Sequence, residues 1–176
     1  MKRLIAFAPL AALLVIVAVG AVLLFRGDGA EREKFAAGLV GRPAPTYALA
    51  RLGGGDLVTS DATRGRAHLV NLFASWCTPC RAEHPMLMAL RRDGVEIVGV
   101  AYKDEPADAQ RFIAELGDPF SAIGLDPDGR LGLEFGATGA PETYVIGPDG
   151  TVRAAYRGPL TAEVIEQIIL PALAAP

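Results

Sequence analysis

The sequence contains only two cysteines in 176 residues, and both lie in a single motif, Cys77-Thr78-Pro79-Cys80. No second cysteine pair exists, and the only histidines are His68 and His84. Structural zinc is almost always held by four ligands, so we expect no metal site. A purely structural disulfide is also a weak alternative, because the stabilisation by a disulfide grows with the length of the loop that it closes, and a C-x-x-C loop is very short.

The chain also has no cluster of basic residues. It carries 17 lysines and arginines against 20 aspartates and glutamates, for a net charge of −3, and the basic residues are scattered. Nucleic-acid binding depends on basic groups that gather against the phosphates, so we expect no nucleic-acid partner. The sequence shows no internal repeat and no low-complexity stretch.

One long hydrophobic run stands at the N-terminus. Residues 4–25 are uncharged over 22 positions, about 33 Å as a helix, which is enough to cross a bilayer core of about 30 Å. The run is longer than the core of a usual signal peptide, so we predict a single transmembrane helix within residues 1–25. A cleaved signal peptide is the alternative, because Lys2 and Arg3 also suit its basic start. The Lys and Arg count is nearly balanced across the run, and the simpler topology puts the following domain in the bacterial periplasm.

The rest of the chain divides into a polar linker, residues 26–42, and one domain, residues 43–176. The domain shows alternating strand and helix patterns. We predict a hairpin at 47–59, strands at 68–74 and 95–101, helices at 81–92 and 106–116, a short helix at 131–135, a hairpin of strands 143–146 and 152–156, and a final helix at 161–173. This order predicts an α/β fold with a central mixed sheet flanked by helices.

The cysteine motif lies between a predicted buried strand and a predicted helix. This order places Cys77 at the helix N-terminus, where the helix dipole and free N–H groups favour a thiolate. A thiolate attacks disulfides, and Cys80, one helical turn on, can then release the trapped partner. The sequence therefore predicts a thiol–disulfide oxidoreductase that needs no bound cofactor, because the Cys77–Cys80 pair is itself the redox centre.

Three segments extend this pattern to a known family. They are Phe73-Ala-Ser-Trp-Cys-Thr-Pro-Cys80, Gly99-Val-Ala-Tyr-Lys-Asp104 and Gly139-Ala-Pro-Glu-Thr-Tyr-Val-Ile146. Many thioredoxin-like proteins share the first, whereas the other two are more specific. Together they resemble the membrane-anchored CcmG/DsbE proteins of cytochrome c maturation, over roughly residues 41–170. The resemblance implies a thioredoxin-like fold, with the hairpin at 47–59 as an N-terminal extension.

The resemblance also implies a substrate groove. Pro141 would be a cis-proline beside the cysteines, exposing backbone for pairing with an extended client. Trp76 would shield Cys77 and contact the client. Glu142 would lie at the groove rim, where its charge would oppose thiolate formation or select basic partners. Tyr102 and Asp104, in the loop after the second long strand, would shape the same groove, although Asp104 could equally be an ordinary exposed residue.

A proton acceptor for Cys80 is the remaining part of the site. Ordinary thioredoxins have a buried aspartate six residues before the first cysteine, but here that residue is Asn71, which cannot take up a proton at neutral pH. Glu83 lies one helical turn after Cys80, and related reductases use a glutamate there. We therefore predict that Glu83 accepts the proton of Cys80. The alternative is a solvated helix carboxylate.

The implied function is that of a periplasmic reductant in cytochrome c maturation. Its client would be the haem-binding C-x-x-C-H segment of apocytochrome c, or a dithiol protein of the same process. Its electron donor would be a membrane thiol carrier, and we expect a monomer. The alternatives are a general periplasmic reductase and a non-catalytic apocytochrome-binding chaperone. The residues between the cysteines and the short Cys80–Pro141 spacing disfavour a disulfide-forming oxidase, and the stretch before Cys77 lacks the threonine of a thiol peroxidase.

Overall fold

The structure is a computed structural model that describes residues 38–175. The predicted membrane helix and most of the predicted linker lie outside the described residues. Within residues 38–175, every helix is too short or too polar to cross a bilayer.

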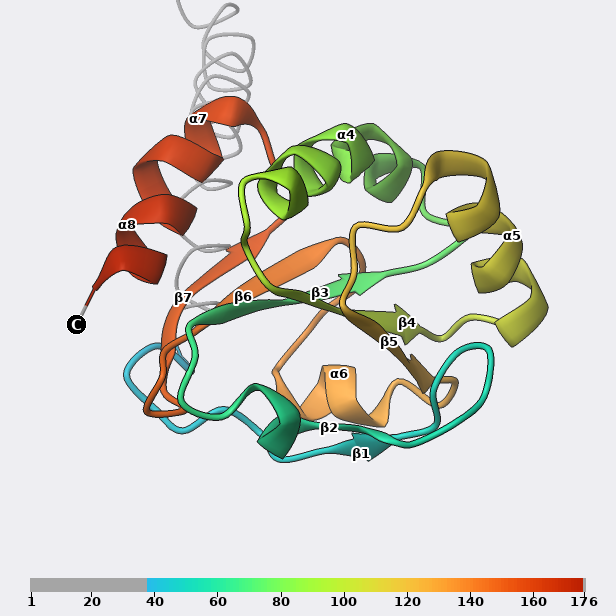
Figure 1. Ribbon diagram of the computed structural model, residues 1–176, viewed down its shortest axis with the longest axis horizontal. Coiled ribbons are helices and arrows are strands. Elements are labelled where there is room, and N and C mark those ends of the chain that lie inside the picture. The colour runs from blue at the N-terminus through green and yellow to red at the C-terminus, as the bar shows by residue number, and fades with distance from the viewer. Residues whose placement is uncertain (1–37, 176) are drawn as a thin grey trace, which may run out of the picture. The chain divides into compact units, whose positions relative to one another are not determined.

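A five-stranded mixed sheet forms the centre of the domain (Figure 1). In spatial order its strands are β5 (Ala122–Asp126), β4 (Ile97–Tyr102), β3 (His68–Phe73), β6 (Glu142–Ile146) and β7 (Val152–Arg157). β3, β4 and β5 run parallel, whereas β6 is antiparallel to both β3 and β7. This arrangement confirms the predicted thioredoxin-like mixed sheet.

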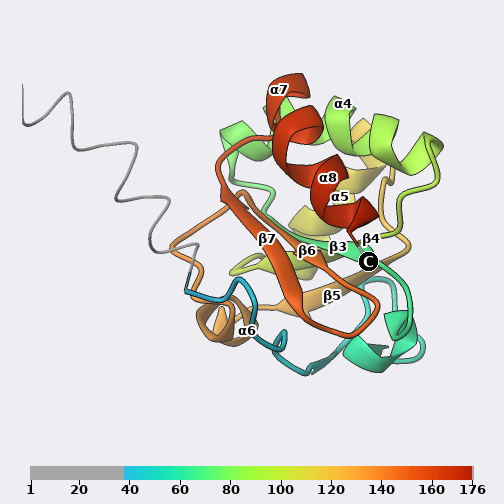
Figure 2. The same ribbon diagram turned by 90° about the vertical axis from the view of Figure 1, so that its left-hand side faces the viewer.

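The helices cover the two faces of this sheet unequally. α4 (Thr78–Arg92) and α5 (Pro106–Leu116) connect successive parallel strands in the same direction, so right-handed crossovers place both on one face. The C-terminal helix covers the same face, and α6 (Arg130–Glu134) covers the other, as Figure 2 shows. We call the first the α4 face and the second the α6 face. Each has its own apolar core.

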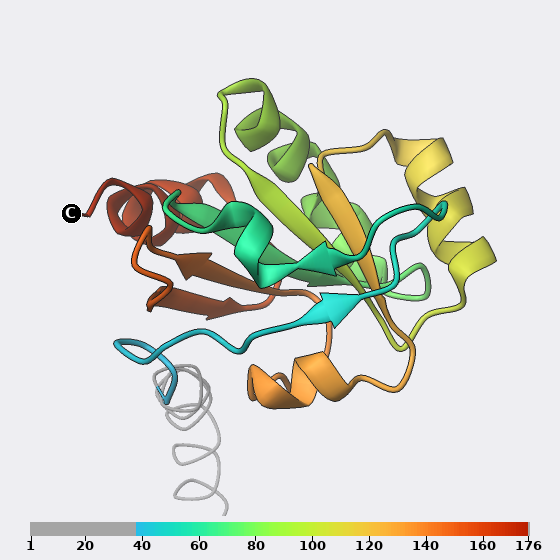
Figure 3. The same cartoon turned by 60° about the horizontal axis from the view of Figure 1, so that its bottom comes forward.

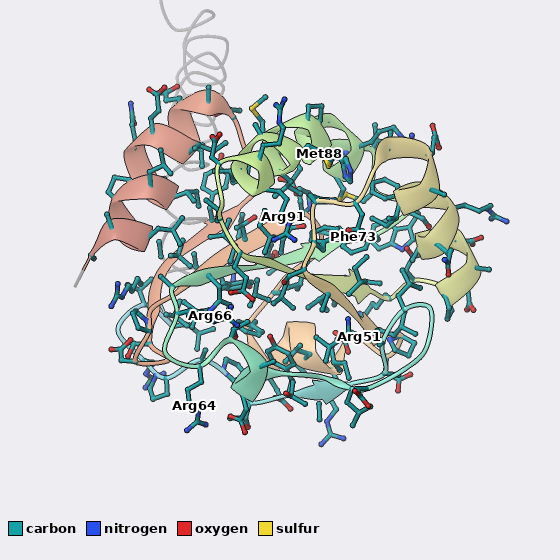
Figure 4. All side chains as sticks on the ribbon, in the orientation of Figure 1. Arg51, Arg64, Arg66, Phe73, Met88 and Arg91 are labelled. Atoms are coloured by element: carbon teal, nitrogen blue, oxygen red, sulfur yellow. A yellow bond between two sulfur atoms is a disulfide. The ribbon has the colours of Figure 1, made fainter. Side chains whose placement is uncertain are left out.

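The side chains of β3 alternate between these two cores, as a strand requires. Leu69 and Phe73 enter the core of the α4 face, and Val70 and Leu72 enter that of the α6 face. Phe73 lies on the side that α4 and α5 cover (Figure 4), and its ring stacks on Phe120 with centroids 4.9 Å apart. Because both faces are covered, β3 is buried along its whole length. This double burial explains why its sequence reads as an almost continuous apolar run.

β5 was not among the strands predicted from the sequence. Its backbone bonds to the N-terminal hairpin of β1 (Ala48–Leu49) and β2 (Val58–Thr59), which runs across the α6 face toward this edge (Figure 3). Gly124 weakens the strand pattern, yet the packing requires it, because a Cβ there would lie 2.6 Å from the Leu49 side chain. The hairpin was predicted, and it covers an edge that would otherwise be open.

The final helix was predicted as continuous over residues 161–173. Thr161 caps it, as predicted, by accepting a hydrogen bond from the Val164 N–H. The helix consists of α7 (Ala162–Val164), a π-helical turn (Ile165–Ile169) and α8 (Leu170–Ala174). Pro171 supplies the reason for the wider turn, because it has no N–H and its ring crowds the carbonyl four residues earlier. A short 3-10 helix, Ser60–Thr63, also precedes β3.

Candidate active site

The two cysteines form a disulfide at the N-terminus of α4, as the sequence predicted. Cys77 is the N-cap residue, and its Sγ accepts a hydrogen bond of 3.1 Å from the Cys80 N–H. The side chains are 4% and 1% exposed, respectively. After reduction, the same N–H and the helix dipole would stabilise a thiolate on Cys77, which makes it the nucleophile of the pair.

A cis peptide bond joins Ala140 to Pro141, which confirms the predicted cis-proline. The bond directly precedes β6, and the cysteine motif directly follows β3. Because β3 and β6 pair antiparallel, with Leu72 opposite Glu142, the end of one strand and the start of the other meet at the same edge of the sheet. Ala140 packs against the core cluster that contains both cysteines. The geometry therefore brings the cis-proline and the redox pair together, as predicted.

The loop before the disulfide is held by the loop after β4. Asp104 accepts hydrogen bonds from the Ser75 N–H at 2.6 Å and from the Ser75 hydroxyl at 2.7 Å. The indole N–H of Trp76 donates to the Lys103 carbonyl at 3.0 Å, and Lys103 has a positive φ of 47°. Trp76 is nevertheless 57% exposed, so most of its ring is free to meet a partner. Its predicted contact with a client stays a prediction.

Two of the residues predicted to shape the substrate groove are buried. The ring of Tyr102 packs on the α6 face, where Cβ atoms at Gly129 and Gly132 would lie 2.9 and 2.4 Å from it. Asp104 is also buried, so the alternative of an ordinary exposed residue is wrong. Both side chains contact other parts of the protein, so in this structure they support the loops around the cysteines and offer a client little surface.

Glu83 is fully buried, so the alternative of a solvated helix carboxylate is wrong. Its Oε1 accepts a hydrogen bond of 2.9 Å from Nδ2 of Asn71, and its Oε2 accepts one of 2.8 Å from the Leu160 N–H. Asn71 Nδ2 also donates to Thr143 Oγ1 at 3.0 Å. Both Glu83 partners are neutral donors, so the carboxylate has no counter-charge among them.

This environment changes the acidity of Glu83. Burial raises its pKa to about 7, although the hydrogen bonds from Leu160 and Asn71 act in the opposite direction. A thiol has an ordinary pKa of about 8.5, so moving a proton from a thiol to an ordinary carboxylate would cost about 6 kcal/mol, but moving it to this one costs only about 2 kcal/mol. Glu83 can therefore exchange a proton with a cysteine one helical turn away, the role predicted from the sequence.

Glu142 does not lie at an open rim, as predicted, but is 2% exposed on the α6 face. Its carboxylate accepts hydrogen bonds from the Thr138 and Gly139 N–H groups, the Thr138 hydroxyl and the Tyr144 hydroxyl. Arg157, directly opposite on β7, donates to it at 3.2 Å. The predicted location is wrong because alternation along β6 turns this side chain inward. Glu142 holds the loop that leads to the cis-proline.

Sequence reasoning missed several residues of the site. Asn71 was recognised only as a residue that cannot replace an acid, and its bond to Glu83 was not foreseen. Thr143, Ser75 and Arg157 were not considered. One signal was present, because Asn71 is the single polar residue inside the apolar run of β3, and a buried amide needs partners.

Comparisons with known proteins agree with this geometry. The family model described as Redoxin matches residues 39–169. The thiol:disulfide interchange protein HelX of Rhodobacter capsulatus is 45% identical over 77% of this chain and 78% of its own. DsbE of Escherichia coli K12, also a thiol:disulfide interchange protein, is 36% identical over 97% of this chain and 94% of its own. A crystal structure of a thioredoxin family thiol:disulfide interchange protein from Chlorobium tepidum superimposes with a TM-score of 0.64, at 27% identity, over 75% of this chain and 96% of that one.

Proposed function

The chain belongs to the Redoxin family and is a thiol–disulfide oxidoreductase, and we propose that it works as a reductant in cytochrome c maturation. The observation that carries the direction of electron flow is the buried carboxyl of Glu83, one turn from Cys80. A reductant must deprotonate its second cysteine while the first is bound to the client, and Glu83 is placed to receive that proton.

The proposed reaction starts from the reduced protein. The Cys77 thiolate attacks one sulfur of a client disulfide, so that a mixed disulfide forms and the other client sulfur leaves as a thiolate. Cys80 gives its proton to Glu83 and attacks Cys77 Sγ. The Cys77–Cys80 bond forms, and the second client sulfur leaves. Two electrons pass to the client, which ends as a dithiol after both of its sulfurs take up protons from solvent.

The client class follows from the resemblance of two segments to the cytochrome c maturation proteins, residues 99–104 and 139–146. We infer that the client is the oxidised C-x-x-C-H segment of apocytochrome c, or a dithiol protein that hands it on. A membrane thiol carrier would restore the reduced state. Exposed Trp76 supports client contact, and the cis-proline supports pairing with an extended segment.

The cellular setting rests on the N-terminal sequence. Residues 1–25 are long and apolar enough for a membrane helix. We propose a single-pass protein of the bacterial inner membrane, anchored by this segment, with a monomeric redox domain in the periplasm.

The direction of electron flow is tested by the reduction potential of the full chain, equilibrated against glutathione or dithiothreitol mixtures. A reductant should have a potential near that of thioredoxin, about −270 mV, or somewhat higher. A value near −120 mV, typical of a strong oxidant, would reverse the proposed direction.

The client is tested with an oxidised C-x-x-C-H peptide. Reduced Cys80→Ser protein should form a stable mixed disulfide with it, whereas Cys77→Ser protein should form none. The wild-type protein should reduce this peptide at least about tenfold faster than oxidised insulin. Equal rates would favour a general reductase, and normal cytochrome c assembly with both cysteines replaced would favour a chaperone.

The role of Glu83 is tested by Glu83→Gln, which keeps the shape of the side chain but removes its basicity. Loss of a general base should slow release of the client from the mixed disulfide by about 100-fold, within the usual range for such groups. The first attack by Cys77 should change much less, and its rate serves as the internal control. If release is unchanged, Glu83 is not the proton acceptor.

A further inference from the structure

The side-chain amide of Asn71 is satisfied on one end only. Its Nδ2 donates to both Glu83 Oε1 and Thr143 Oγ1, whereas its Oδ1 is buried without a hydrogen-bond partner among the described residues. Buried amide oxygens in native proteins nearly always have a partner. An orphaned acceptor beside a buried carboxyl therefore needs a physical reason.

The three side chains come together from three elements. Asn71 on β3 and Thr143 on β6 lie directly opposite in the strand register, and both point to the α4 face. Glu83 reaches them from α4, and all three are fully buried. Glu83 is the only ionisable group of the three, so its charge decides which hydrogen bonds the cluster can make.

The observed amide orientation suits the ionised form of Glu83. A carboxylate can only accept hydrogen bonds, and here both of its oxygens accept from N–H donors. The protonated form is different, because one oxygen must donate. The Leu160 N–H comes from the backbone and cannot become an acceptor, so Oε2 stays an acceptor and the proton belongs on Oε1. Two donors, Oε1–H and Asn71 Nδ2–H, would then face each other.

We propose that Asn71 is a positioning residue whose amide rotates when Glu83 takes up a proton. A half-turn about the Cβ–Cγ bond exchanges Oδ1 and Nδ2, two groups of nearly equal size. Oδ1 then accepts from Glu83 Oε1–H, and the Thr143 hydroxyl reverses its role and donates to the same oxygen. The amide thus makes two side-chain bonds in both charge states. No other group gains or loses a proton beyond the transfer from Cys80 to Glu83.

This inference rests on the proposed function, in which Glu83 receives the proton of Cys80, and it explains why the position is served by an amide. Ionised aspartate at residue 71 would repel ionised Glu83, and leucine would pair with neither form. The groups that face Glu83 from β3 and from the loop before α7 are the Asn71 amide and the Leu160 N–H. Among the described residues, no charged side chain contributes to its pKa.

Rotation can be observed directly by NMR in the oxidised full chain with isotope labels. Glu83 would be titrated through its carboxyl carbon, while the nuclear Overhauser effect between the Asn71 amide protons and the Thr143 methyl group is recorded. That effect should be strong above the Glu83 midpoint and lost below it, with the same midpoint as the carboxyl signal. A contact that stays constant while Glu83 titrates would overturn the proposal.

A second test uses Asn71→Leu and reads the Glu83 midpoint. A rotating amide serves both charge states, so its loss removes one partner from each and should shift the midpoint by less than about half a unit. A fixed donor would serve only the ionised state, and its loss would raise the midpoint by about one unit or more. The larger shift would therefore contradict rotation.

Failure of this inference and failure of the proposed function are distinguishable. The NMR experiment uses the wild-type protein and reports rotation whether or not Glu83 assists Cys80. The rate of client release in Glu83→Gln reports the function of Glu83 whether or not the amide rotates.

Discussion

Glu83 and Glu142 are both buried glutamates, but they lie on opposite faces of the central sheet and have different partners. Glu83, on the α4 face, accepts from one amide and one backbone N–H, and burial raises its pKa to about 7. Glu142, on the α6 face, accepts from an arginine, two hydroxyls and two backbone N–H groups. The few neutral donors leave Glu83 able to change its charge. The many donors around Glu142, one of them cationic, use its charge to hold a loop.

The neighbours of Glu142 respond to its charge as well. Burial raises the pKa of Tyr144, and the hydrogen bond to Glu142 raises it further. Arg157 also donates to the Gly136 carbonyl, so the same cation ties together β7 and the loop before the cis-proline. The two glutamates therefore separate two tasks, proton exchange near Cys80 and support of the loop at Pro141.

The largest effect should come from removing the charge that holds the loop. Glu142→Ala leaves the mostly buried Arg157 without its counter-charge and leaves loop N–H groups without an acceptor. Breaking a buried ion pair by removing one partner typically costs about 3–5 kcal/mol. We expect a loss of this size in the free energy of unfolding, measured by urea denaturation. A loss below about 1 kcal/mol would mean that Glu142 is not a structural anchor and would remove the contrast with Glu83.

The next effect is the pH dependence of stability that Glu83 causes. Its pKa in the folded protein, about 7, lies above the ordinary value of 4.5, so the folded state holds the proton more tightly than the unfolded state. The stability from this proton is fully present below about pH 4.5 and is lost as the pH rises through about 7, by up to roughly 3 kcal/mol.

Glu83→Gln isolates this contribution from that of every other titrating group. The difference in unfolding free energy between wild type and Glu83→Gln, both oxidised, should change across pH 4.5 to 8 in the direction that disfavours wild type at high pH. A pH-independent difference would mean that Glu83 does not titrate with a raised pKa, and the comparison would then fail on the α4 face.

A smaller effect is expected from Asp104, a third buried carboxylate, which has only neutral donors around it. Asp104→Ala removes both of its bonds to Ser75, and we expect a stability loss of about 1–3 kcal/mol, the usual cost of losing bonds to a charged group. Trp76 is the only tryptophan, so its fluorescence reports the freed loop. Ser75→Ala removes only the hydroxyl bond and should lose about half as much or less. If fluorescence and client affinity both stay unchanged, Asp104 does not position this loop.

The smallest effect sets the baseline for the comparison. Arg111 and Asp108 form an ion pair on the surface of α5, with most of the arginine exposed. Because exposed pairs gain little over their hydrated ions, Arg111→Ala should change the free energy of unfolding by about 0–0.5 kcal/mol in the same urea measurement. A change as large as that of Glu142→Ala would mean that burial does not explain the difference between these carboxylates.

Much of the fold was predictable because its signals are local. The buried run of β3 and the sharp limits of α5, which begins at Pro106 and ends before Gly117, are set by nearby residues. β5 escaped prediction because Gly124 lowers its strand character, and only its packing under Leu49 explains the glycine. A close approach between segments about 75 residues apart leaves no local pattern to read.

In the site, the chemistry was predictable and the environment was not. The sequence by itself determined the redox pair, the position of Cys77 at a helix N-terminus and the glutamate one turn after Cys80. Only the tertiary structure decided that Glu83 is buried against Asn71 and Leu160, and that Glu142 turns inward to Arg157. The physical reason is that the acidity of a carboxyl depends on desolvation and on donors, and here one donor, the Leu160 N–H, lies 77 residues away along the chain.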